Sequence, residues 1–267
     1  MSRSIGLRSL LAWALVACIP FSDAKVKLPD WLDQAIAVES PDFNENNPPE
    51  IVVLWDEGKY KFGEDGSLYR NVRYAFRIVD SGGRSRARMS AQYIKGSAKI
   101  TQLKAWAIDK EGEAYAFKNS EIEDIGITGY SLYSENRAKT IDGRSKCMVG
   151  SIFAYEYEVE EKSVFSQYRW YFQSSVPVAL SRLEVVVPEG WRVEETRFNG
   201  APKSIFADGS YLWEMRDMPM IAREKDAPYR SVKRSFITLD VRSPENKLTR
   251  HSALAFETWE DISNYTA

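Results

Sequence analysis

From residue 51 to residue 241, apolar side chains recur at every second position in short runs. An alternation with a period of two is typical of strands that bury one face. Turn residues, such as those at 63–66, 81–83 and 188–190, bound the runs, and no long helical pattern intervenes. The clearest runs lie at 72–79, 106–108, 114–117, 153–160, 168–172, 183–187, 211–215 and 236–241. The pattern therefore predicts an all-β, mainly antiparallel sandwich, either single or as two stacked sandwiches.

Short helices are expected at both ends of this β-rich region. Asp30 to Val38 is a short amphipathic segment, and a Pro/Asn-rich linker follows it at 40–49. Residues 258–265 have the pattern of the first turns of a helix with Thr258 as its N-cap. We thus divide the chain into 1–24, a short helix and linker at 25–49, a β-sandwich domain at 50–250, and the start of a linker helix at 251–267.

The first 24 residues have the features of a secretory signal peptide. Arg3 and Arg8 precede an apolar stretch at 10–19, and Ser22 and Ala24 supply small residues at the cleavage site. The stretch is too short for a permanent transmembrane helix. The mature chain contains no apolar stretch that is long enough to span a membrane either. We therefore expect export to the periplasm.

The same stretch permits a second interpretation. Leu15, Val16, Ala17 and Cys18 resemble a bacterial lipobox, in which the cysteine thiol is lipidated and becomes the mature N-terminus. Ordinary cleavage after Ala24 is favoured, with a lipid-anchored envelope protein as the alternative. Both routes lead out of the cytoplasm.

Composition excludes several kinds of function. The net charge of −2 gives no general attraction to nucleic acid. One histidine and two cysteines are too few for a typical zinc site. The sequence also lacks a P-loop, a GxGxxG motif and a metal-ligand spacing, so no cofactor is expected.

Two sets of residues resemble catalytic groups. Cys147, His251 and Asp261 follow the chain order of a cysteine-nucleophile triad. Cys147, however, precedes a strand and has no evident helix N-terminus to activate it, so we interpret it as a structural cysteine and His251 as a surface residue. The acids Glu156, Glu158, Glu160 and Glu161 could suggest paired carboxylates, but their alternation favours the solvated face of a strand. The sequence therefore predicts no enzyme.

Two groups of residues are candidates for ligand binding. Arg84, Arg86 and Arg88, near Arg73 and Arg77, could form a basic strip across a hairpin that contacts a phosphate or an acidic polymer. They could equally protect a strand edge. Tyr130 and Tyr133 lie in a polar, glycine-containing stretch, where they could stack on a ligand such as a sugar. Trp106, Trp170, Trp191 and Trp213 fall on strand patterns and are expected in the core.

Several local patterns resemble the bacterial domain-of-unknown-function 3857 family over about residues 50 to 265. They are the turn Asp65-Gly66, the hairpin at 109–112, the stretch 149–157, Phe172-Gln173 with Pro177, Leu212-Trp213-Glu214 before Met218-Pro219, and the closing stretch 258–262. The resemblance implies an exported β-rich domain without catalytic groups, which precedes a transglutaminase-like core with a papain-like Cys-His-Asp site. The positions of that core have no counterparts in this sequence.

The resemblance also indicates the function and the partners. We expect a non-catalytic accessory or binding domain that acts with a transglutaminase-like core, in cis or in trans. The alternative is a free-standing module that binds an envelope polysaccharide or protein. A cysteine hydrolase that uses Cys147 is a remote third hypothesis.

Overall fold

The computed structural model describes residues 26–127, 135–162, 167–221, 233–244, 247–248 and 253–254. Most of them lie in strands, which confirms the predicted all-β class. The helical elements are short: α1 (Asp30–Ala37), as expected near the N-terminus, and the 3-10 helices η1 (Ser81–Arg86) and η2 (Asn119–Glu121). The helix expected at 258–265 lies outside the described residues.

The strands follow one another closely along the chain. They are β1 (Ile51–Phe62), β2 (Ser67–Ile78), β3 (Arg88–Ile94), β4 (Ala98–Ile108), β5 (Ala114–Ala116), β6 (Glu123–Gly126), β7 (Asn136–Asp142), β8 (Ile152–Lys162), β9 (Gln167–Tyr171), β10 (Val178–Val186), β11 (Arg192–Phe198), β12 (Ile205–Ala207), β13 (Ser210–Met218), β14 (Phe236–Arg242), β15 (Lys247–Leu248) and β16 (Ala253–Leu254).

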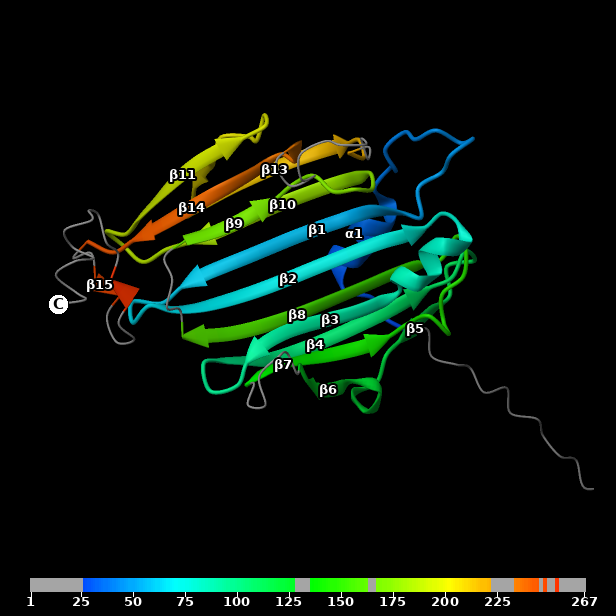
Figure 1. Cartoon of the computed structure of the whole chain (residues 1–267), viewed down its shortest axis with the longest axis horizontal. Coiled ribbons are helices and arrows are strands. Elements are labelled where there is room, and N and C mark those ends of the chain that lie inside the picture. Colours follow the sequence, from blue (N-terminus) through cyan, green and yellow to red (C-terminus); the bar gives the residue numbers. More distant parts are fainter. Residues whose placement is uncertain are drawn as a thin grey trace, which may run out of the picture.

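One large sheet organises the molecule. Its eight strands have the order β12-β13-β10-β1-β2-β8-β4-β5, and the long strands β1, β2 and β8 lie at its centre (Figure 1). Every pairing in this sheet is antiparallel except that of β1 with β10, which is parallel. The predicted hairpin around 109–112 is present as β4 and β5.

Two three-stranded sheets cover one face of the large sheet, which we call the inner face. They have the orders β11-β14-β9 and β3-β7-β6, and they lie on opposite flanks of the molecule in Figure 1. Trp170, Ile237 and Leu239 of the first sheet and Met89 and Ile141 of the second belong to the same buried core as the inner face. The sandwich therefore consists of one large sheet faced by two small ones.

Helix α1 covers one end of the opposite face, the outer face. Leu32 and Ala35 are fully buried, and Trp31 is 5% exposed. They pack in a second cluster with apolar residues of the outer face, such as Leu54, Trp106 and others of β2, β8 and β10. The outer face therefore has a covered end and an end that α1 does not reach.

Helix α1 also covers Glu156, an acid that the sequence pattern predicted to be exposed to solvent. Glu156, Glu158 and Glu160 do share the outer face, but Glu156 is only 6% exposed. Its carboxylate accepts a hydrogen bond from Trp31 Nε1 at 2.9 Å and lies 3.6 Å from Arg73 Nε. Lys104 Nζ lies 3.5 Å from its other oxygen. The prediction of a wholly solvated acidic face is thus wrong at Glu156, because a helix distant in sequence packs over it.

Glu57 is a second buried acid on the outer face. It is fully buried and accepts hydrogen bonds from Arg182, Arg73 and Trp55. Burial alone would raise the pKa of Glu57, but the two guanidinium groups and the indole N–H outweigh it and hold the pKa below its ordinary value. Glu57 is therefore ionised and paired at neutral pH.

Candidate functional site

The end of the outer face that α1 leaves uncovered carries two rows of side chains across adjacent strands. The strand registers place Tyr69 of β2 opposite Glu160 of β8, and Glu160 opposite Lys99 of β4. In the next row, Ser67 lies opposite Lys162, whose backbone N–H donates to the carbonyl of Ser97 at 2.9 Å. Residues two apart on a strand share a face, so both rows point to the same side.

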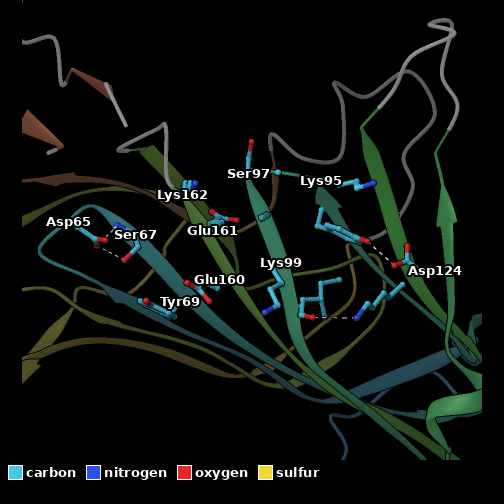
Figure 2. Close-up of a pocket in the computed structure, with 15 residues that line it drawn as sticks. Asp65, Ser67, Tyr69, Lys95, Ser97, Lys99, Asp124, Glu160, Glu161 and Lys162 are labelled. Carbon is cyan, nitrogen blue, oxygen red and sulfur yellow. Dashed lines mark hydrogen bonds between the residues drawn. The ribbon is translucent and has the colours of Figure 1, made fainter. Parts of the chain in front are cut away.

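A cavity of about 640 Å³ is open at this place, and we call it the end hollow. Figure 2 shows Tyr69, Glu160 and Lys99 along one line, with Lys162, Ser97 and Lys95 along the rim. Lys95 and Ser97 belong to the tight β3–β4 turn, in which Gly96 adopts a φ of 89°. That left-handed conformation favours glycine and keeps the turn short.

The β3-β7-β6 sheet supplies one wall of the end hollow. Tyr93 donates its hydroxyl to Asp124 at 2.8 Å, and Arg137 Nε donates to the same carboxylate at 2.8 Å. Desolvation pushes the pKa of Asp124 upward, but the hydrogen bonds from Tyr93 and Arg137 lower it below its ordinary value. This carboxylate is charged and already paired at neutral pH.

The acids and the lysines of the end hollow differ in their partners. Asp65 accepts from the Ser67 hydroxyl at 2.6 Å, and Glu161 pairs with Arg70 at 2.6 Å. By contrast, Lys95, Lys99 and Lys162 are exposed, and no carboxylate among the described residues lies within 4.0 Å of any of their ammonium groups. In the described part of the chain, the hollow therefore has more lysine charges than carboxylate charges without an oppositely charged partner.

A second cavity, of about 450 Å³, adjoins the end hollow. The two share Tyr93, Ser97, Ala98, Glu161 and Lys162 as lining residues. The second cavity extends from β3 to the start of β9, where Gln167 and Tyr168 line it. The hollow thus continues towards the region between the two small sheets.

Tyr130 and Tyr133, the predicted stacking residues, lie outside the described residues. The described residues on either side of them lie close to the end hollow. Lys95 donates its backbone N–H to the carbonyl of Glu135 at 2.9 Å, and Ile127 donates to the carbonyl of Asn136 at 2.8 Å. The binding role of the two tyrosines stays a prediction.

The structure does not bring the predicted arginines together on a hairpin. Arg84 and Arg86 lie in η1, and Arg88 begins β3. Arg84 Nε donates to the carbonyl of Arg144 at 2.8 Å, and Arg86 pairs with Glu50 at 2.7 Å. The predicted strip is therefore wrong in its geometry, because the Ser-Gly-Gly turn winds into a 3-10 helix, although ligand binding by these arginines stays untested. They follow the end of β2 remote from Ser67 and so lie away from the end hollow.

Cys147 does not have the surroundings of a nucleophile. It is fully buried, and burial raises the pKa of its thiol to about 11, only partly opposed by the charge of Arg84. A thiol with this pKa is protonated at neutral pH, and the thiolate is the reactive form. His251 and Asp261 lie outside the described residues.

The described residues also lack two kinds of feature. They contain no group of three or more His, Cys, Asp or Glu side chains placed to hold a metal ion. In the same part of the chain, no helix is both long enough and apolar enough to cross a membrane.

Tyr69, Lys95, Lys99 and Lys162 stand in no distinctive motif of the sequence. Each is ordinary alone, because exposed tyrosines and lysines are common on strands and turns. Only the register of β2, β8 and β4 places them around one hollow. Local alternation gives the face of each residue but not its cross-strand neighbour.

Comparison with solved structures shows the same fold in a larger protein. A protein from Parabacteroides distasonis ATCC 8503, named "putative protease", matches with a TM-score of 0.63 and 14% identity. The match covers 73% of this chain and 41% of that protein, so this chain spans less than half of its length. At this identity the likeness shows the fold alone.

Two other matches are weaker. Yeast leukotriene A4 hydrolase in complex with bestatin has a TM-score of 0.36 and 9% identity, covering 82% of this chain and 36% of that one. An M1 zinc metallopeptidase from Deinococcus radiodurans has a TM-score of 0.33 and 7% identity, covering 71% and 42%. Both TM-scores are too low to support an argument about this chain.

The family comparison is more informative. No curated protein matches the sequence. A family model described as "Domain of Unknown Function with solved-structure structure" (DUF3857), however, matches residues 64–222, which include β2 to β13 and all residues that line the end hollow. This match covers more than half of the chain and agrees with the resemblance in the sequence. The chain belongs to the DUF3857 family.

Proposed function

We propose that this chain is an exported, non-catalytic binding domain that acts with a transglutaminase-like core, in the same polypeptide or as a separate protein. One observation carries the proposal: the fold recurs as less than half of a larger protein that is named "putative protease". In that protein the fold therefore accompanies a substantial further length of chain. A domain that accompanies a catalytic core commonly contributes recognition, through loops and hollows on a rigid scaffold.

The surroundings of Cys147 support a non-catalytic role. A cysteine hydrolase would need a thiolate at neutral pH, whereas burial raises the pKa of this thiol to about 11. The hypothesis of a hydrolase that uses Cys147 is tested by alkylation with iodoacetamide at pH 7.5, on protein that starts at Lys25. We expect slow labelling of the folded protein and fast labelling after unfolding in guanidinium. Rapid labelling of the folded protein would support the hydrolase instead.

Association with a core is tested on the endogenous protein. An antibody raised against residues 50–250 is used on envelope fractions of the source bacterium after chemical cross-linking, and the captured bands are identified by mass spectrometry. Two results would support the proposal: a polypeptide heavier than 30.5 kDa that contains a Cys-His-Asp core, or this chain cross-linked to such a core. Recovery of the chain at its own mass with no core protein would contradict it.

The end hollow favours one second candidate function. Its three unneutralised lysines are a recognition feature that needs no catalytic core. A free-standing module that binds an envelope polymer through this hollow would account for them. Binding by the isolated chain, together with a negative cross-linking result, would favour this second function.

A further inference from the structure

The free charges of the end hollow indicate the charge of its ligand. Three of the four acids that line the hollow, Asp65, Glu161 and Asp124, have hydrogen-bond or ion-pair partners, and among the described residues only the Glu160 carboxylate has none. Lys95, Lys99 and Lys162 have no carboxylate within 4.0 Å in the described part of the chain. A ligand that enters the hollow meets more uncompensated positive than negative charge, so an anion is favoured over a cation.

Tyr69 gives the hollow an aromatic surface. It is 46% exposed, and among the described residues it has no ring partner and no hydrogen-bond partner. The hydroxyl group of Tyr93, the other tyrosine of the hollow, already donates a hydrogen bond to Asp124. An exposed tyrosine combines an apolar ring face with a polar tip, which suits a ligand with both C–H faces and hydroxyl groups.

Hydrogen-bonding groups lie between the aromatic ring and the lysines. Glu160 lies between Tyr69 and Lys99 in the strand register, and Ser97 adjoins Lys162 on the rim, as Figure 2 shows. A free carboxylate accepts hydrogen bonds from hydroxyl groups, and a serine both donates and accepts. Adjacent strands are about 4.8 Å apart, so Tyr69 and Lys99, two strands apart, are separated by about the length of two sugar rings.

We propose that the end hollow binds an anionic glycan, that is, a chain of sugars that carry carboxylates. Tyr69 packs on a sugar ring, Glu160 and Ser97 bind hydroxyl groups, and Lys95, Lys99 and Lys162 bind the carboxylates. This inference rests on the proposed binding function and adds the class of ligand to it. A cavity of about 640 Å³ has room for a short stretch of such a chain.

The floor of the hollow favours a glycan over an extended acidic peptide. A peptide in a β-rich site usually adds to a free sheet edge through its backbone. Here β2 and β8 have paired strands on both sides, so the floor between Tyr69 and Glu160 offers side chains rather than free backbone groups. At residues 98–100, β4 pairs with β8 alone and leaves one strand edge beside the hollow, so the poly-glutamate peptide in the test below distinguishes a peptide from a glycan. Side-chain recognition of hydroxyl groups and carboxylates does not need a strand edge.

The test is calorimetric titration of the mature chain with oligogalacturonate at low and at physiological salt. Uncharged maltooligosaccharide and a poly-glutamate peptide of similar charge are the comparison ligands. The test variant combines Lys95→Gln, Lys99→Gln and Lys162→Gln. A matched control combines Lys27→Gln, Lys110→Gln and Lys203→Gln, three exposed lysines outside the hollow that give the same change in net charge. Tyr69→Ala tests the ring.

We expect the wild type to bind oligogalacturonate but not the uncharged oligosaccharide. The test variant should bind about tenfold more weakly, because three exposed charge contacts are lost together, while the control stays within about twofold. Tyr69→Ala should weaken binding about threefold or more, because part of the ring contact is lost. Thermal unfolding checks that all variants fold, which is expected because every changed side chain is exposed.

Three results would overturn the inference. The first is no binding by the wild type. The second is equal weakening in the test and control variants, which would indicate only long-range attraction. The third is poly-glutamate binding of equal strength that Tyr69→Ala leaves unchanged, which would indicate an acidic peptide. None of these depends on a core, so failure here is separate from failure of the cross-linking experiment.

Discussion

Asp56 is an acid on the inner face of β1, between the large sheet and the small sheet that contains β9. The Ser181 hydroxyl donates to its carboxylate at 3.3 Å and accepts a hydrogen bond from Trp170 Nε1 at 3.1 Å. Burial raises the pKa of Asp56 from 3.8 to about 7, and the single hydrogen bond from Ser181 only partly opposes it. Unlike Glu57, the next residue, Asp56 has no ion-pair partner in the described part of the chain.

This difference predicts a pH dependence of stability. Between pH 3.8 and about 7, the folded state holds a proton on Asp56 that the unfolded state has released. The free energy of unfolding therefore falls as the pH rises through this interval and stays low above it. Asp56→Asn removes the carboxyl group whose ionisation lowers the free energy of unfolding. At pH 8 the variant should therefore be about 1–3 kcal/mol more stable than the wild type. Near pH 4 the two proteins should be nearly equal in stability.

Urea unfolding at pH 4, 6 and 8 measures this difference. The control is Glu189→Gln, which removes an exposed acid and should leave the pH dependence unchanged. A stability difference between wild type and Asp56→Asn that is the same at all three pH values would contradict the prediction.

Single residues also show what the sequence could and could not tell. The alternation in 153–160 correctly places Glu156 and Glu160 on one face of β8 and Phe153 on the other. It could not distinguish Glu156, which Trp31 and Arg73 enclose, from Glu160, which lies in the open hollow. The distinction depends on a helix 125 residues away, and no local pattern carries that information.

At the scale of elements, α1 depends on packing for its stability. It has eight residues, its N-cap is Pro29, and no side chain caps its first turn. A helix of this length is not stable alone in water. Asp30 and Asp33 in its first turn interact favourably with the helix dipole, but their contribution to the stability of the helix is small. Most of its stabilisation therefore comes from the buried side chains of Trp31, Leu32 and Ala35.

Truncation of one buried side chain tests this dependence. Leu32→Ala removes a fully buried side chain and should lower the free energy of unfolding by about 2–4 kcal/mol. Gln34→Ala, on the exposed side of the same helix, should change it by less than about 0.5 kcal/mol. Urea unfolding followed by circular dichroism measures both. An effect of Leu32→Ala as small as that of Gln34→Ala would mean that α1 does not contribute to the cooperative fold.

The elements themselves were largely predictable, but their order in the sheets was not. A short amphipathic segment locates α1, and alternation with turn residues locates the hairpin at 109–112 and most of the long strands. They contain no information on the parallel pairing of Val53 in β1 with Val178 in β10, or on the antiparallel pairing of β9 with β14. These pairings join distant segments, and they are chosen by burial of whole faces rather than by local propensity.

At the scale of the whole molecule, the two faces of the large sheet are covered in different ways. The inner face is covered by two small sheets, and only one end of the outer face is covered by α1. The uncovered end of the outer face is therefore polar and forms one part of the end hollow, which also extends past β4 to the β3-β7-β6 sheet. Sequence alternation alone cannot predict this difference, because the strands at the covered end are apolar on both faces, as Val52 and Val53 illustrate.

The position at which the folded part of the chain begins predicts the N-terminus of the mature protein. Val26 and Leu28 pack against the cluster formed by α1 and the outer face, only two and four residues beyond the predicted cleavage site after Ala24. Cleavage there would leave a chain that enters the fold almost at once, whereas lipidation at Cys18 would leave a short tether. We expect the protein isolated from the periplasm to begin at Lys25 and to carry no lipid.

Intact-mass analysis of the protein from soluble and membrane fractions checks this N-terminus. The matched variant is Cys18→Ser, which removes the thiol that lipidation needs and leaves Ser22 and Ala24 in place. With ordinary cleavage, wild type and variant give the same mature mass in the soluble fraction. A wild-type protein that stays in the membrane fraction with the mass of a lipid on Cys18, and that Cys18→Ser releases, would contradict the prediction.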